Sequence, residues 1–63
     1  MDITKVEITI ETGNAAFDKD EQGMEIARIL RYASEHFKYG GTDDISLRDH
    51  NGNTVGSVVV HLE

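Results

Sequence analysis

The sequence predicts an α+β fold, a two-layer β-α-β-β sandwich with one helix on one face of a three-stranded sheet. Three observations predict it. Apolar and polar residues alternate near the N-terminus, apolar residues recur with helical spacing in the middle of the chain, and an Asn-Gly pair separates two alternating segments near the C-terminus. We expect the 63 residues, 1–63, to form a single domain.

The first strand is predicted at about residues 4–11, because Val6, Ile8 and Ile10 alternate there with polar residues. The three apolar side chains are expected in the core, and the polar ones in solvent. A Thr-Gly-Asn turn ends the strand. Phe17 follows this turn and is expected to close one end of the core.

A helix is predicted at about residues 21–39. Asp18 and Glu21 fit a capping box, with Asp20 as an alternative N-cap, and Gly40-Gly41 is expected to end the helix. The apolar stripe comprises Ile26, Ile29, Leu30, Ala33 and Phe37. The opposite, solvated side comprises Glu25, Arg28, Arg31, Glu35 and Lys38.

A hairpin is predicted from two strands at about residues 45–49 and 54–61. Asn51-Gly52 favours a two-residue type I′ turn, in which both residues take positive φ. Counting back from this turn pairs Leu47 with Gly56 and Ile45 with Val58. The inward side chains of the hairpin are then Ile45, Leu47, Val58, Val60 and Leu62.

The alternative is a three-residue loop with a Gly bulge, which would turn Val55, Ser57 and Val59 inward. We consider it the weaker choice because it buries a hydroxyl and exposes two valines. The run 58–60 is the most apolar strand segment, so the third strand is expected to be central. The first strand then lies antiparallel to the third and parallel to the second.

The composition argues against nucleic acid and membrane as partners. Twelve acidic and six basic residues give a net charge of −6, whereas binding to phosphates requires Lys and Arg. No apolar run approaches the roughly 20 residues of a membrane helix, and the N-terminus lacks a signal-peptide pattern. With no cysteine in the chain, we expect a cytoplasmic protein.

Neither a metal nor a cofactor is expected. Asp49-x-Asn51-x-Asn53 resembles the start of a calcium loop, but Gly52 occupies the fourth position and Val60 the twelfth, where such loops need Glu. These Asp and Asn side chains are instead expected to bond the local backbone. No recognised metal-ligand spacing joins His36, His50 and His61.

The sequence also predicts that the protein is not an enzyme. It has no Cys nucleophile, no glycine-rich phosphate loop and no Gly-x-Ser-x-Gly elbow. A filled core in so short a chain is expected to leave little room for a ligand pocket of about 300 Å³ or more. A small hydrolase would need such a pocket, with polar side chains converging on it.

We therefore expect function by contact with another protein, with a homodimer as one form of that contact. Val55 and Val59 are predicted on the exposed face of the sheet, and the first strand lies at its edge. The predicted interface comprises Lys5, Glu7, Arg48, Val55 and Val59. The alternative is an acidic inhibitor that mimics nucleic acid, with acids at Asp18, Asp20, Glu21, Asp43 and Asp44.

The chain resembles a group of small uncharacterised proteins encoded by bacteriophages and prophages. The resemblance lies in the first strand, Asn14-Ala15-Ala16-Phe17, Ala27-Arg28-Ile29-Leu30-Arg31 and Leu47-Arg48-Asp49-x-Asn51-Gly52-Asn53-x-Val55-Gly56. Lys19 and Gly23 depart from the more helix-forming versions. The resemblance implies a phage or prophage origin and the host cytoplasm, and it implies no activity.

Overall fold

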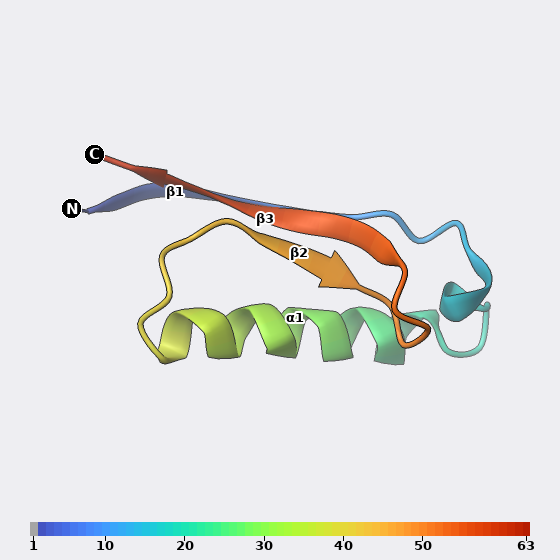
Figure 1. The fold of residues 1–63 in the computed structure, drawn as a ribbon. Helices are drawn as coiled ribbons and strands as arrows, with labels where there is room; N and C mark the ends of the chain where they lie inside the picture. The colour runs from blue at the N-terminus through green and yellow to red at the C-terminus, as the bar shows by residue number, and fades with distance from the viewer. Residues whose placement is uncertain (1) are drawn as a thin grey trace.

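The computed structural model describes residues 2–63 and contains three strands and one long helix (Figure 1). The elements are β1 (Ile3–Ile10), the 3-10 helix η1 (Ala15–Phe17), α1 (Gln22–Lys38), β2 (Ile45–Arg48) and β3 (Thr54–Leu62). The sheet order is β1-β3-β2, and β3 pairs antiparallel with both neighbours. The predicted α+β class and the central third strand are confirmed, with the predicted boundaries correct to within one residue.

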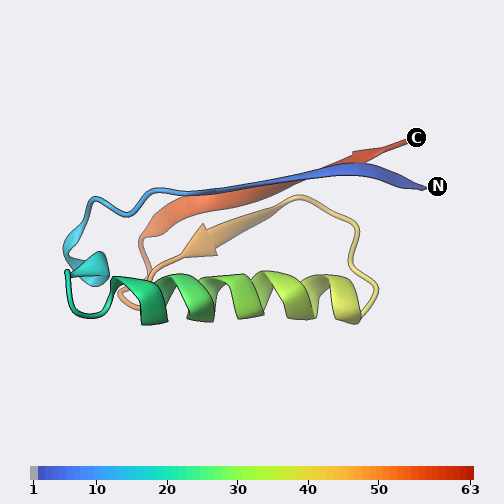
Figure 2. The ribbon, with the colours of Figure 1, turned by 180° about the vertical axis from the view of Figure 1, so that it is seen from behind.

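The helix lies on the β2 side of the sheet. Two opposite views show α1 running alongside β2, while the paired strands β1 and β3 extend past the C-terminal end of the helix (Figures 1 and 2). Both chain ends lie at this projecting end. Asp2 and Glu63 exchange two backbone hydrogen bonds there, with N···O distances of 3.3 and 3.0 Å.

The predicted capping box is wrong. Glu21 occupies the N-cap position of α1, and its side chain makes no capping hydrogen bond. The Asp18 carboxylate instead accepts the Asp20 N–H at 3.3 Å, and the Asp18 carbonyl accepts the Glu21 N–H at 2.8 Å. These bonds form the turn that reverses the chain between η1 and α1, so Asp18 lies too far upstream to cap the helix.

The predicted end of the helix is confirmed. Gly40 has a φ of +89°, and its N–H donates to the Phe37 carbonyl at 3.0 Å. The Gly41 N–H donates to the His36 carbonyl at 2.8 Å. This pair of bonds is the Schellman motif, in which a left-handed glycine satisfies the last helical carbonyls.

The hairpin loop has three residues, so the predicted two-residue type I′ turn is wrong. The Asp49 N–H donates to the Asn53 carbonyl at 2.9 Å, and the Gly52 N–H donates to the Asp49 carbonyl at 3.0 Å. Gly52 has a φ of +84°, but Asn51 does not take the positive φ that a type I′ turn requires. The loop therefore consists of residues 50–52, with glycine at the left-handed position.

A β-bulge restores the predicted register beyond the loop. Arg48 pairs with Thr54 and Leu47 with Gly56, which leaves Val55 as an extra residue on β3. The bulge offsets the extra loop residue, so Ile45 still pairs with Val58 as predicted. Val55 turns inward and is 5% exposed, and the prediction that it lies on the exposed face is therefore wrong.

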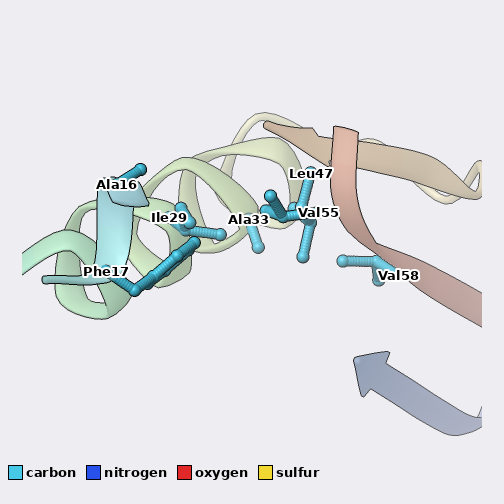
Figure 3. Packing of buried hydrophobic residues seen from close by; sticks show 7 residues of the cluster. All are labelled: Ala16, Phe17, Ile29, Ala33, Leu47, Val55 and Val58. Atoms are coloured by element: carbon cyan, nitrogen blue, oxygen red, sulfur yellow. The ribbon is translucent and has the colours of Figure 1, made fainter. Parts of the chain in front are cut away.

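The core lies between α1, η1 and the β2–β3 hairpin (Figure 3). Ile29, Leu47 and Val58 are completely buried. Phe17 is 4% exposed at one end of this cluster, as predicted. The remaining buried apolar residues are Ala16, Ala33 and Val55, and the partly buried ones are Ile10, Ile26, Phe37, Ile45 and Val60.

Four side chains predicted in the core are instead substantially exposed. Val6 and Ile8 of β1 are 40% and 44% exposed, and Leu30 of α1 is 42% exposed. Leu62, near the end of β3, is 40% exposed. The cause is the lateral position of the helix: α1 makes its close sheet contacts with β2, so the same sheet face remains uncovered at β1.

Candidate functional site

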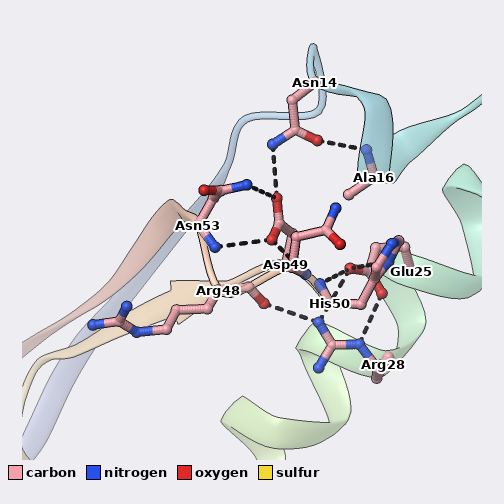
Figure 4. Close-up of polar contacts among 9 residues, drawn as sticks. Asn14, Ala16, Glu25, Arg28, Arg48, Asp49, His50 and Asn53 are labelled. Atoms are coloured by element: carbon pink, nitrogen blue, oxygen red, sulfur yellow. Dashed lines mark hydrogen bonds and ion pairs between the residues drawn. The ribbon is translucent and has the colours of Figure 1, made fainter.

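Two regions of the molecule stand out chemically. One is a cluster of polar side chains, centred on the buried carboxylates of Glu25 and Asp49, that joins α1 to the hairpin loop (Figure 4). The other is an exposed apolar surface, which we call the open face. The polar cluster comprises Asn14, Glu25, Arg28, Asp49, His50 and Asn53.

Glu25 forms the helical half of the polar cluster. Its carboxylate accepts Arg28 Nε–H at 2.7 Å and Nη2–H at 3.1 Å, and it accepts the His50 backbone N–H at 2.6 Å. The Glu25 side chain is only 6% exposed, so its predicted place on the solvated side of the helix is wrong. Arg28 Nη2 also donates to the Arg48 carbonyl at 2.9 Å, which fastens α1 to β2.

These contacts shift the acidity of both partners. The hydrogen bonds from Arg28 lower the pKa of Glu25; burial opposes this shift, and the His50 N–H adds to it. The same hydrogen bonds raise the pKa of Arg28. Both groups are therefore held in their charged forms, as expected for a bidentate pair.

Asp49 forms the loop half of the polar cluster. Its Oδ1 accepts the backbone N–H groups of Asn51 and Asn53, both at 2.9 Å, which confirms the predicted local bonding. Its Oδ2 accepts the side-chain amides of Asn14 at 2.8 Å and Asn53 at 3.2 Å. Burial raises the pKa of Asp49, but the hydrogen bonds from Asn53, Asn14 and Asn51 outweigh it, and the net pKa lies below the usual range.

A cavity of about 370 Å³ lies beside the polar cluster, contrary to the expectation of little room for a pocket. The polar side chains that line it include Arg28, Tyr32, Ser46, Arg48 and His50. Arg28 is already paired with Glu25, and Arg48 Nη1 donates to the Gly52 carbonyl at 3.2 Å. Within residues 2–63, no hydrogen bond joins the Ser46 hydroxyl to the His50 ring.

The three histidines lie apart. His36 Nε2 is 3.0 Å from the Asp43 carbonyl oxygen, His50 Nδ1 is 3.3 Å from Glu25, and His61 Nε2 is 2.6 Å from Glu7. Over the described range 2–63, no group of three His, Asp or Glu side chains converges as metal ligands would.

The open face comprises Ile3, Val6 and Ile8 of β1, Leu62 of β3 and Leu30 of α1. In the strand register, Ile3 lies opposite Leu62, Val6 opposite Val60, and Ile8 opposite Val58. Directly opposed residues of antiparallel strands point to the same side of the sheet. Since Val58 is buried in the core, the four strand residues of the open face point to the core side, beyond the part that α1 covers.

Leu30 continues the open face onto the helix. At 100° per residue, Arg28 and Tyr32 lie on the flank of α1 that adjoins β2, and they line the cavity there with Ser46. Leu30 lies on the other flank, beyond the buried Ala33. The five members are 40–44% exposed, and none of them carries a charge.

None of the residues of the predicted interface belongs to the open face. Glu7 and Val59 are directly opposed on the sheet face that points away from the core, where Lys5 Nζ lies 3.8 Å from the Glu7 carboxylate. Arg48 lies at the hairpin and bonds its loop. Lys5, Glu7 and Val59 thus share one surface, whereas Arg48 is held at the loop and Val55 lies in the core.

The acidic side chains considered for mimicry do not form one surface. Asp18, Asp20 and Glu21 precede α1, whereas Asp43 and Asp44 follow it. A helix of 17 residues, about 25 Å long, separates the two groups. Asp44 also accepts the Val60 N–H at 2.7 Å, at a part of β3 that β2 does not reach.

Comparisons with known proteins found no relative. No family model matches the chain, and no curated protein or solved structure shows significant similarity to it. The resemblance to phage and prophage proteins therefore stays a prediction. The helix within residues 2–63 is too short and too polar to cross a membrane.

Proposed function

We propose that this chain is a small non-enzymatic accessory protein of a phage or prophage that acts by binding another protein through the open face. The observation that carries the proposal is the exposure of five large apolar side chains, four of which share the core-side face of the paired strands β1 and β3. Single exposed apolar residues are ordinary, but a contiguous group of them is typical of a binding surface.

The polar cluster supports the proposal indirectly. Its carboxylates and the Arg28 guanidinium are paired with one another and with backbone groups, and they join α1 to the hairpin. Such pairing gives these groups a structural role, whereas the five apolar side chains of the open face remain exposed. The proposed binding surface therefore differs from the predicted one: Val55 is buried, Val59 lies on the face that points away from the core, and the open face lies on the core side of the sheet.

Site-specific photo-cross-linking tests the proposal. We would place a benzoylphenylalanine at Val6, on the open face, or at its neighbour Lys5, on the other face of the same strand. We expect a discrete protein adduct from position 6 and none from position 5. Equal labelling from both positions, or no adduct from position 6, would contradict binding through the open face.

A further inference from the structure

We infer that the open face is covered by a second copy of this chain, packed face to face to form a symmetric dimer. This inference rests on the proposed function, since it names the partner of the same surface. Its support comes from the shape of the molecule, its accessible area and the chemistry of the open face.

The single chain is too extended for its mass. Its radius of gyration is 12.5 Å, whereas a compact chain of this length has about 10.6 Å. Its principal extents are 40 × 18 × 17 Å, because β1 and β3 project beyond the helix. Its accessible surface is 4570 Å², against about 4,000 Å² for a compact monomer of 7.0 kDa.

A dimer removes this excess. Two separate copies expose twice 4570 Å², whereas a compact protein of twice the mass exposes about 6,700 Å². Two compact monomers of 7.0 kDa would themselves expose about 8,000 Å², so about 1,100 Å² of the difference is specific to the extended shape of this chain. This surplus surface lies close to the lower bound of the roughly 1,200–2,000 Å² that stable interfaces bury.

The chemistry of the open face suits a copy of itself. A two-fold interface places the same patch against itself, so any charge within the patch meets a like charge near the axis. The five side chains that define the open face are apolar, so a two-fold contact between them would bring none of the acidic groups behind the net charge of −6 together at its centre. The opposite face, with Lys5, Glu7 and His61, lacks this property. A different dimer, formed only by pairing of the β1 edge strands of two copies, would leave the open face exposed.

Sedimentation equilibrium of the whole chain between about 1 and 100 µM, the micromolar range in which a contact of ordinary strength dissociates, tests the inference. We expect twice 7.0 kDa for the parent chain and 7.0 kDa for Ile8→Lys. The matched control is Thr9→Lys, which adds the same charge on the other face of β1 and should remain dimeric. Circular dichroism verifies that each variant is folded. If Ile8→Lys is unfolded, Leu30→Lys on α1 replaces it, with the same expected mass.

The outcomes separate this inference from the proposed function. A parent chain that stays at 7.0 kDa at every concentration overturns the dimer, while a position-6 adduct with a different protein would still support binding through the open face. A dimer that persists in Ile8→Lys and Leu30→Lys places the interface elsewhere and overturns the inferred dimer, while the position-6 adduct still decides the proposed function. A dimer lost in the open-face variants and kept in Thr9→Lys supports both.

Discussion

At the scale of single residues, Gly56 shows how closely two strands approach. It lies in β3, opposite Ile10 of β1 and Leu47 of β2. A Cβ atom built at this position would collide with the Thr9 carbonyl oxygen, which belongs to the backbone and cannot rotate away. The side-chain hydrogen of glycine is thus a packing requirement of the sheet.

We expect Gly56→Ala to destabilise the protein by about 1–3 kcal/mol or more, because β1 must move away from β3 to admit the methyl group. Gly13→Ala is the control, since a Cβ at Gly13 meets nothing within 4 Å. Urea denaturation at one fixed protein concentration measures both variants. Equal stability of the two variants would show that β1 and β3 do not approach this closely.

Val55 and Val59 test the bulge directly. Val55 is 5% exposed and Val59 is only partly buried. Val55→Ala should therefore lower the unfolding free energy by about 2 kcal/mol, through lost burial and a residual cavity, and Val59→Ala by about 1 kcal/mol or less. Thermal melts of both variants measure the difference, and a reversed order would indicate the register without the bulge.

At the scale of elements, the polar cluster connects three segments that are distant in sequence: the turn at Asn14, the helix α1 and the hairpin loop. Asn14 bonds Asp49 across 35 residues, and Glu25 bonds the His50 N–H across 25 residues. Asn14, Arg28, Asp49 and Asn53, which lie in three separate motifs of the sequence, converge here. Their hydrogen bonds give these motifs a structural role in holding the fold together.

The depressed pKa values of Glu25 and Asp49 make this fastening sensitive to pH. A carboxyl group whose pKa is lower in the folded state stabilises the protein above its unfolded pKa, near about 4, and this stabilisation is lost as the pH falls through the folded pKa. We therefore expect the melting temperature to fall steadily below about pH 4.

Glu25→Gln should reduce the fall in melting temperature at low pH, because it removes one of the two carboxylates that must be protonated. Melting temperatures at constant ionic strength and protein concentration measure the effect. The matched control is Glu35→Gln, at an exposed position of the same helix, which should keep the parent slope. An unchanged slope in Glu25→Gln would show that the pair with Arg28 does not contribute.

The sequence predicted the elements well because their signals are local. Alternation in β1, helical spacing in α1 and the glycine pair at its end each depend on a few neighbouring residues. The prediction of a two-residue turn is wrong because Asn-Gly also fits a three-residue loop with left-handed Gly52. A bulge at Val55 offsets the extra loop residue, so the pairing farther along the strands is the same for both loop lengths. Local preference does not distinguish loop lengths that a bulge can offset.

The open face was beyond sequence reasoning for a different reason. Alternation shows that Val6 and Ile8 share one side of β1, but it does not show what covers that side. Coverage depends on where α1 lies across the sheet, and the hydrogen bonds from Arg28 to the Arg48 carbonyl and from the His50 N–H to Glu25 hold the helix beside β2. Those contacts are long-range, so the exposure of Leu30 follows only from the structure.

At the scale of the whole molecule, one helix is too little cover for this sheet. Chains of this size bury only about 60% of the surface that they expose when unfolded, and the off-centre helix leaves apolar area in solvent. A second copy would supply the missing cover and would make the observed stability depend on protein concentration.

The salt dependence of self-association tests whether the inferred dimer interface is apolar. Each copy carries a net charge of −6, so the two copies repel one another, and added salt screens this repulsion. We expect the dimer dissociation constant to decrease from about 20 to 500 mM NaCl, a range over which the screening length falls severalfold. Sedimentation equilibrium measures it, with monomeric Ile8→Lys as the control. Weaker association at high salt would indicate contacts between opposite charges and would contradict an apolar interface.

The backbone bonds between Asp2 and Glu63 have a topological consequence. Because the two ends of the described chain lie side by side, the polypeptide enters and leaves this fold at nearly one point. A short peptide linker would close the chain into a ring, and new ends could be opened at Gly40-Gly41 without cutting a strand or the helix. The same geometry would let the fold be inserted into a surface loop of a host protein with little disturbance to either partner.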